Sequence, residues 1–390
     1  MRRLPCRVGA ARRAIAVLIV FVGLASACGA PSGDTQAEAR EVATVEAGLD
    51  QLERARASRV EGDYLVAQTL LRQAAAADPT DADAKLALAA ALASQHAFAE
   101  ALELADSVIA EDPDHPGALA LRGDVHLAIG QLRAAAEDHR RLHEVAPGPA
   151  SLVRLAHGLE ESGDPRTALQ LVDQALAELE RQEQARGVEP SGEAAAWFRW
   201  RLADLHRHLG DTETAAPLFW AALEIQPEYA LAYDGLVDIA LTEGRVDDAG
   251  ELLDRWPAGS TIRVEAAIAV AEAIGDDDAV DRLRRDLIAD LETRDRIAAG
   301  LDLAVALLDA DTRIDEAVGL TSTELTRRTN AATLAVHARA LLAADRADEA
   351  LPVIERMLAT GTNEPDRIAV AADVLRAVGQ PERVSDLPAL

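Results

Sequence analysis

The stretch LADLHRHLGDTETAAPLFWAALEIQP, residues 202–227, contains the pattern that predicts the fold. Ala203 lies in a first helical half, and Ala215 lies in a second half whose apolar residues recur at helical spacing. Gly210 stands between the halves and is expected to end the first helix, because glycine adopts the left-handed conformation of a helix end at no steric cost. Pro227 follows the second half, and proline cannot continue a helix. The stretch therefore predicts two helices joined by a tight turn.

The same pattern recurs along the chain with a period of about 34 residues. Proline ends the second half at Pro79, Pro113, Pro147 and Pro227, and alanine recurs at Ala67, Ala101 and Ala135. Glycine is expected to end the first half at Gly62, Gly130, Gly163, Gly210 and Gly244. Small residues at Ala89, Gly123, Ala156 and Ala203 let the two helices of a unit approach closely. About nine units fit residues 46–385, and the pattern is weakest over residues 258–300.

The period and these positions resemble the tetratricopeptide repeat, whose pattern is W-x₂-L-G-x₂-Y, then A-x₃-F, then P. The resemblance implies an all-α protein, an α-solenoid (superhelix) of about nine tetratricopeptide-like helix-turn-helix units whose stacking supplies the core. It also implies a protein that binds other proteins. The predicted parts are 28–45 (tether and start of the first helix), 46–182 (repeats), 183–195 (insertion) and 196–390 (repeats that degenerate toward the C-terminus, with a capping segment).

Residues 1–27 have the pattern of a signal peptide, with arginines followed by a short apolar run. The small residues directly before Cys28 resemble the lipobox of bacterial lipoproteins. That resemblance implies cleavage before Cys28, acylation of its thiol, and a lipid anchor in the cell membrane or outer membrane, facing the periplasm or exterior. Ala25 stands where that family usually has Leu, Val or Ile. Simple secretion with cleavage after Ala27 is therefore an alternative, and an uncleaved anchor is a third.

Composition and motifs limit the classes of function. The net charge of −28 argues against nucleic acid as a partner, because nucleic-acid affinity depends on Lys and Arg that neutralise phosphates. The two cysteines, Cys6 and Cys28, allow neither an internal disulfide nor a cysteine-based metal site in the mature protein. No GxxxxGK[ST], HExxH or GxSxG motif occurs. We therefore expect no enzyme activity and no cofactor.

The concave groove lined by the first helix of each unit is the predicted partner-binding surface, as the resemblance implies. Trp197 and Trp200 stand out because the chain has only four tryptophans and their spacing places both on one helix face. Buried aromatic residues often anchor interfaces, although packing of the two rings against residues 177–195 is an equal alternative. The predicted groove residues are Trp197, Trp200, Asp204, Arg207, Asp124, His157 and Asp238, accompanied by Leu127, Val153, Glu160, Asp234 and Leu241.

The groove lacks the lysine and asparagine with which some tetratricopeptide proteins bind a C-terminal carboxylate, since those positions hold Leu86, Ala90, Ala120 and Asp124. His139 and His143 have the helical spacing of two metal ligands, but structural histidines are the preferred interpretation and no metal is expected. The predicted function is an extracytoplasmic, membrane-tethered scaffold or adaptor for cell-envelope proteins. A peptide or small-ligand capture protein is the alternative, and a metal-dependent enzyme is a weaker one.

Overall fold

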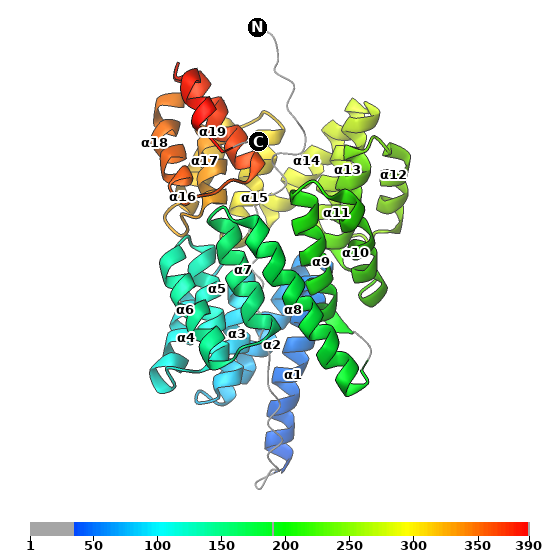
Figure 1. Ribbon diagram of the computed structural model, residues 1–390, viewed down its shortest axis with the longest axis vertical. Coiled ribbons are helices and arrows are strands. Elements are labelled where there is room, and N and C mark those ends of the chain that lie inside the picture. The colour runs from blue at the N-terminus through cyan, green and yellow to red at the C-terminus, as the bar shows by residue number, and fades with distance from the viewer. Residues whose placement is uncertain (1–34, 189–190, 389–390) are drawn as a thin grey trace.

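The computed structural model of the protein describes residues 35–188 and 191–388. These residues form helices and turns, without a β-strand among them (Figure 1). The predicted signal peptide, residues 1–27, and the predicted lipidation residue, Cys28, lie outside the described residues. Within the described ranges, no helix combines the length and the apolar character needed to cross a membrane. The fold is the predicted all-α solenoid.

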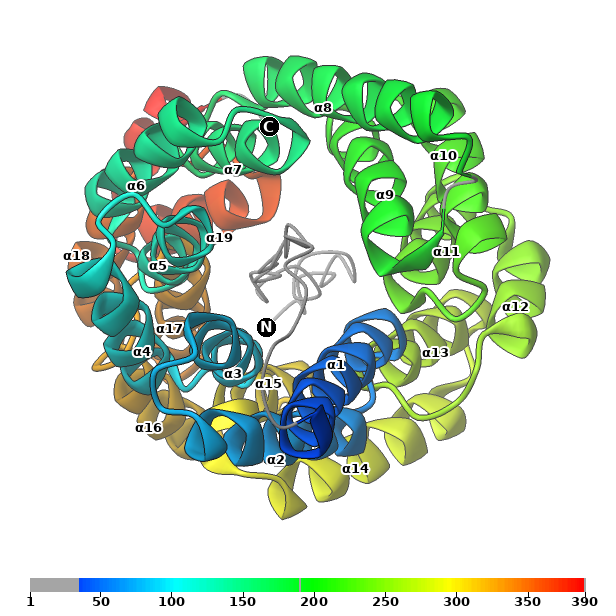
Figure 2. The same ribbon diagram turned by 90° about the horizontal axis from the view of Figure 1, so that it is seen from below.

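The helices pair along the chain, and one helix of each pair lies on the inside of the superhelix while the other covers the outside (Figure 2). The inner helices are α1 (Thr35–Ser58), α3 (Ala82–Ser94), α5 (Pro116–Ala128), α7 (Pro149–Glu161), α9 (Gly192–His208), α11 (Ala230–Thr242), α13 (Thr261–Ile274), α15 (Arg296–Asp309), α17 (Ala331–Ala343) and α19 (Pro365–Ala377). The outer helices are α2 (Glu61–Ala77), α4 (Phe98–Glu111), α6 (Leu132–Val145), α8 (Pro165–Arg186), α10 (Thr212–Ile225), α12 (Val246–Arg255), α14 (Asp277–Thr293), α16 (Ile314–Glu324) and α18 (Ala347–Leu358). A 3-10 helix, η1 (Pro381–Asp386), packs on α19. The described part of the chain thus contains nine pairs followed by α19 and η1, in agreement with the predicted nine units.

The turn residues of the sequence set the ends of most helices. Pro79, Pro113, Pro147 and Pro227 follow α2, α4, α6 and α10 as predicted. Gly130, Gly163, Gly210 and Gly244 have φ angles between 73° and 88°, the left-handed conformation expected at the end of an inner helix. The prediction for Gly62 is wrong, because Gly62 lies inside α2. Arg59 makes that turn instead, with φ of 59°, and His96 makes the next one, also with φ of 59°.

Small residues bring the paired helices together, and adjacent pairs then share one core. A Cβ atom on Gly123 would lie 2.4 Å from Cδ2 of His139, so only glycine permits this approach of α5 and α6. A Cβ atom on Gly235 would likewise lie 2.3 Å from Cζ of Phe219. The largest buried apolar clusters each join several consecutive pairs, as expected of a solenoid in which no single unit buries enough apolar area.

The superhelix makes more than one turn, so that its last helices stack on its first ones. Viewed along the axis, α15–α19 lie over α3–α7 (Figure 2). The long helix α1 lies inside the first turn and packs against α9 and α11. Its residue Ala57 belongs to the same buried cluster as Trp197 and Trp200 of α9. Helix α1 therefore ties the start of the solenoid to its middle.

Candidate functional site: the charged inner face

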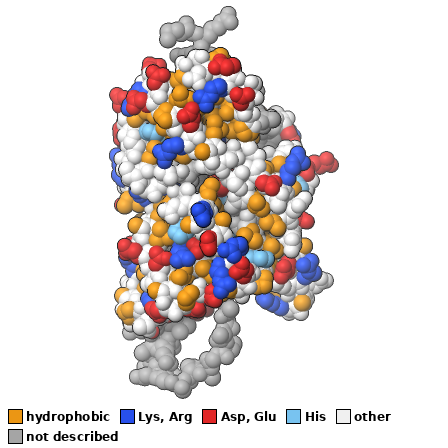
Figure 3. Space-filling model, turned by 60° about the vertical axis from the view of Figure 1, so that its left-hand side comes forward, with side chains coloured by type: hydrophobic (Ala, Val, Ile, Leu, Met, Phe, Trp, Pro, Cys, Tyr) orange, Lys and Arg blue, Asp and Glu red, His pale blue; other side chains and the backbone are white. Residues whose placement is uncertain are grey.

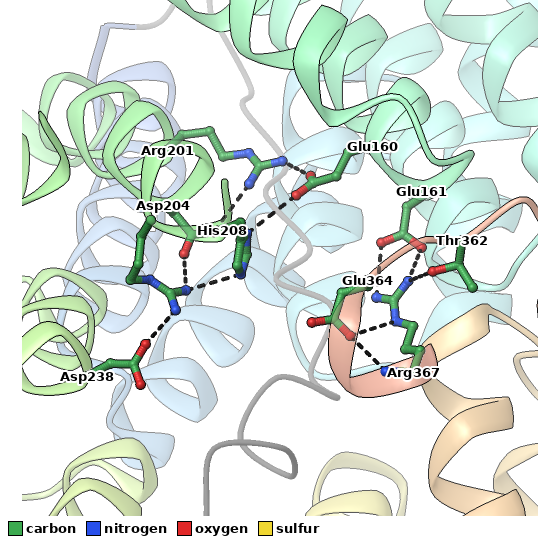
Figure 4. Close-up of polar contacts among 10 residues, drawn as sticks. Glu160, Glu161, Arg201, Asp204, His208, Asp238, Thr362, Glu364 and Arg367 are labelled. Atoms are coloured by element: carbon green, nitrogen blue, oxygen red, sulfur yellow. Dashed lines mark hydrogen bonds and ion pairs between the residues drawn. The ribbon is translucent and has the colours of Figure 1, made fainter. Parts of the chain in front are cut away.

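Ion pairs cross the inner face of the solenoid from α7 through α9 to α11 (Figure 4). Arg207 donates to Asp204 on its own helix and to Oδ2 of Asp238 on α11, at 2.6 Å. Arg201 pairs with Asp204 at 3.4 Å and with Glu160 of α7. The Nδ1 atom of His208 lies 3.6 Å from Asp204 and 3.8 Å from Glu160. We call these residues the inner network: Glu160, Arg201, Asp204, Arg207, His208 and Asp238.

Burial and mutual charge fix the protonation states of the inner network. Asp204 is 8% exposed, and burial alone would raise the pKa of its carboxyl group. The positive charges of His208, Arg207 and Arg201 outweigh burial and hold that pKa well below its ordinary value. Burial opposes the charge of Arg207 as well, but Asp204 and Asp238 raise the pKa of its guanidinium above the ordinary value. Asp204 and Arg207 are therefore both ionised throughout the physiological pH range.

A second ion pair lies next to the inner network and joins the two turns of the superhelix. Glu161 follows Glu160 at the end of α7, and its Oε2 lies 3.1 Å from Nη1 of Arg367 on α19 (Figure 4). Arg367 also donates to Oγ1 of Thr362 at 3.2 Å. Burial would raise the pKa of Glu161, but Arg367 and His157 lower it below the ordinary value. The charged surface thus continues from the first turn onto the second.

Two other predicted groove residues, Asp124 and His157, lie outside the inner network. Asp124 is buried, and its carboxylate accepts from Nε of Arg154 at 3.0 Å and lies 3.0 Å from Nε2 of His139. His157 lies one repeat further along, where burial and the charge of Arg201 lower its pKa. Asp124 therefore holds α5, α6 and α7 together through Arg154 and His139.

Trp197 and Trp200 lie in the core of α9 and α11. They are 4% and 6% exposed, and their ring centroids are 6.3 Å apart. Trp200 also lies 6.4 Å from the ring of Tyr229. The long end of α8 contributes to this packing through Leu179, which lies against the same buried cluster. In this conformation the two indole rings offer little surface to a partner, and a role in partner binding stays a prediction.

The two histidines with metal-ligand spacing bind different protein groups. His139 is buried against Asp124, whereas Nδ1 of His143 lies 2.9 Å from Oγ of Ser151. Among the described residues, no group of three or more His, Cys, Asp or Glu side chains is placed to hold a metal ion.

The outer surface has a different electrostatic character from the inner face. In Figure 3, acidic and basic side chains lie beside one another on the outer surface and do not gather by sign. The side chains of the outer ion pair Arg72–Glu100, which are 2.6 Å apart, are each about half exposed. Exposed pairs of this kind contribute little free energy because water and salt screen them. The pairs of the inner network are partly buried and so are screened less, which makes the inner face the better candidate for selective binding.

Part of this site was predictable from the sequence. Asp204, Arg207 and Asp238 were predicted as groove residues, and the structure joins all three through Arg207. Arg201 and His208 were not predicted as groove residues. His208 could have been found, because it directly follows the predicted residue Arg207 at the end of α9. In the same way, Glu161 directly follows the predicted residue Glu160 at the end of α7. Arg367 had no local signal, because its partner Glu161 lies 206 residues away in the sequence.

Comparison with known proteins agrees with the fold. The tetratricopeptide repeat family matches residues 52–116, 153–230 and 200–261 of this chain, which together are somewhat less than half of its length. These stretches are therefore similar to tetratricopeptide repeats, a type of repeat that mediates protein–protein interaction. No curated protein matches the chain in sequence.

Solved structures of repeat proteins are similar to the chain at low sequence identity. A thermophilic tetratricopeptide protein from Thermus thermophilus is 20% identical, with a TM-score of 0.40 over 48% of this chain and 92% of its own. PilW, a type IV pilus biogenesis factor, is 15% identical, with a TM-score of 0.44 over 55% of this chain and 95% of its own. Yeast Tom70 is 15% identical, with a TM-score of 0.45 over 96% of this chain and 69% of its own.

Proposed function

We propose that the protein is a scaffold that binds other proteins of the cell envelope on the inner face of its solenoid, while a lipid on Cys28 holds it at the membrane. The observation that carries the binding part is the inner network, a partly buried chain of ion pairs on the face formed by α7, α9 and α11. Tetratricopeptide repeats mediate protein–protein interaction, and the inner network lies on the inner side of the superhelix, where it links three successive inner helices.

The chemistry of the inner network suits recognition of a polar protein surface. Guanidinium groups present a planar fork of donors that matches carboxylates, and the carboxylates beside them match basic side chains. A partner that carries both signs can replace some of these pairs without leaving a buried charge alone. Complementary charges of this kind give specificity and fast association more than raw affinity.

The proposal assigns no catalytic step to the chain. A general acid or base works best when its pKa lies near the working pH. Asp204 is held ionised far from that range by its cationic neighbours, so it is suited to a structural or binding role. The absence of nucleotide, zinc-protease and serine-hydrolase motifs from the sequence supports the same interpretation.

Crosslinking in cells followed by purification tests the binding part. The test variant is Arg207→Gln/Asp238→Asn, which removes both members of one inner pair and so leaves the net charge unchanged. The matched control is Arg72→Gln/Glu100→Gln, which makes the same chemical change on the outer surface. We expect a defined set of envelope proteins to co-purify with the wild type and the control, and part of that set to be lost with the inner variant. Equal capture by all three proteins would refute the inner face as the binding surface.

The membrane tether has its own test, which does not depend on the partner. We expect the wild-type chain to incorporate a radiolabelled fatty acid and to sediment with membranes. Cys28→Ser should abolish the label and release the protein into the soluble fraction. A Cys28→Ser protein that still sediments with membranes would contradict the lipid anchor.

A further inference from the structure

The two turns of the superhelix meet along a seam made by turns and helix ends, not by packed helices. On the first turn, the seam is formed by the consecutive inner-to-outer turns at His96, Gly130 and Gly163. Arg327 donates to the main-chain oxygen of His96. One repeat further, the N–H of Thr329 donates to the carbonyl oxygen of Ile129 at 2.9 Å. These contacts join residues that are about 200 positions apart in the chain.

The chain has two asparagines, and both lie at this seam. The Nδ2 atom of Asn330 donates to the carbonyl oxygen of Ala128 at 2.7 Å. The Nδ2 atom of Asn363 donates to the carbonyl oxygen of Gly163 at 2.9 Å. Asn330 and Asn363 are 33 residues apart, whereas their acceptors, Ala128 and Gly163, are 35 residues apart, so the two contacts are similar without being equivalent. Each asparagine joins the second turn to the end of an inner helix of the first turn.

Glycines allow the backbones to meet this closely. A Cβ atom on Gly163 would lie 2.2 Å from the carbonyl oxygen of Gly361 on the second turn. A Cβ atom on Gly130 would lie 2.7 Å from the main-chain nitrogen of Asn330. Both glycines have φ near 87°, so their left-handed conformation and the contact each require a residue without a side chain.

The seam is polar, whereas the joints within each turn are apolar. The buried cluster of the C-terminal repeats, formed by residues between 287 and 375, is separate from the clusters of the first turn. Across the seam lie hydrogen bonds, the Glu161–Arg367 ion pair, and Arg328 above the ring of Phe98 at 5.9 Å. By contrast, α1 joins α9 through a shared apolar core. The contacts named here that hold the seam are therefore polar or cation–π contacts, and no buried apolar cluster of the described residues spans it at α17 and α19.

We propose that α15–α19 form an arm that opens from the first turn at the seam and closes onto it again through Asn330 and Asn363. Because the repeats from α12 to α15 pack on their neighbours along the chain, a small change at each joint after α11 adds up to a large movement of the arm. The inner network and the Glu161–Arg367 pair lie beside the seam (Figure 4). Opening of the arm therefore makes these residues accessible to a partner as large as a folded protein. The movement itself does not depend on the proposed binding function.

Hydrogen exchange at the Thr329 amide measures opening directly, because its acceptor is Ile129 on the other turn. The test variant is Asn330→Asp/Asn363→Asp. An aspartate at 330 keeps the oxygen that caps α17 through the N–H of Thr333, but it loses the donor to the first turn. The control is Gln182→Glu, the same amide-to-carboxylate change on the outer helix α8. We expect hydrogen exchange at the Thr329 amide to be at least about tenfold faster in the test variant than in the wild type. Amides inside α17 of the test variant, and Thr329 in the control variant, should exchange at the wild-type rate.

Three results would overturn the proposal that the arm opens. If Thr329 exchanges at the wild-type rate in the test variant, the asparagines do not hold the seam. If amides inside α17 accelerate as much as Thr329, the C-terminal repeats unfold and do not swing as a body. Spin labels at Glu137→Cys and Glu349→Cys, in a chain with both native cysteines changed to serine, report the distance between the turns. The test variant should add a longer distance, and a single unchanged distance would also refute the proposal.

Discussion

Glu193 offers a sharp test of the contact between α1 and α9, because its carboxyl group is buried at that contact. Glu193 is 5% exposed and faces Arg56 of α1 and Arg59 in the turn that follows α1. Its N–H donates to Oε1 of Glu53 at 2.6 Å. Burial raises the pKa of Glu193 to about 7, although the two arginines act in the opposite direction and Glu53 adds to the rise. The carboxyl group is therefore neutral in the folded protein at mildly acidic pH.

The sign and size of the effect on stability follow from this shift. A raised pKa in the folded state means that protonation stabilises the fold, fully below the ordinary pKa of 4.5. This contribution is lost as the pH rises from 4.5 to about 7. Each pKa unit corresponds to about 1.4 kcal/mol, so the loss is about 3 kcal/mol. Glu193→Gln keeps the neutral form at every pH. We therefore expect the variant to match the wild type at pH 4.5 and to be more stable by about 3 kcal/mol at pH 8.5.

Urea unfolding followed by tryptophan fluorescence measures this difference. The four tryptophans all lie between residues 197 and 256, so the signal reports the repeats that begin with α9. Glu349→Gln, the same change at an exposed position in α18, is the control and should have little effect at either pH. A Glu193→Gln protein that is less stable than the wild type at pH 8.5 would refute the reasoning. That result would mean that an ionised Glu193 pairs with Arg56 and Arg59.

Two further predictions concern packing and the inner network. Gly123→Ala places a Cβ atom 2.4 Å from the ring of His139, so we expect a loss of about 2 kcal/mol in unfolding free energy, measured by circular dichroism during urea unfolding. Gly158→Ala in α7 meets no atom within 4 Å and should instead be neutral or stabilising by up to about 1 kcal/mol; equal effects of the two changes would contradict the packing argument. Asp204→Asn removes the central charge of the inner network and leaves its arginines without one carboxylate, so it should cost about 3 kcal/mol, and unchanged tryptophan-monitored stability would show that this carboxylate is not needed to balance them.

The solenoid could be predicted from the sequence because the determinants of each unit are local. A proline after each outer helix and a glycine after each inner helix act within a few residues of themselves, and they recur with the repeat. The Gly62 prediction failed because the first turn comes three residues earlier, where Arg59 takes the left-handed conformation without being glycine. Residues 258–300 lost the repeat pattern but still form α13 and α14. An Asp276 cap and an apolar face suffice to make a helix pair when neighbouring repeats supply the packing surface.

The charged site was less predictable, because its residues depend on distances between repeats. The sequence placed Asp204, Arg207 and Asp238 on one surface, since equivalent positions of successive inner helices lie side by side. For Trp197 and Trp200 the sequence allowed two interpretations equally, exposed anchors of an interface or rings packed against residues 177–195. The choice between surface and core depends on α1 and on the extended end of α8, whose positions no repeat pattern describes.

Closure of the superhelix could not be predicted from the repeat at all, since it is the sum of small rotations over the units between the first turn and the second. An error of a few degrees at each joint would move α17 by several ångströms relative to α5. The contacts at the seam tolerate no such error, because Gly163 and Gly361 meet at backbone distance and Asn330 reaches a single carbonyl oxygen. The side-chain oxygen of Asn330 caps α17, which aspartate or serine could also do, but its amide nitrogen donates to the first turn, which neither of them could do. The placement of the two asparagines is therefore explained by closure and not by the repeat, which is why their replacement is the most direct test of whether the arm opens.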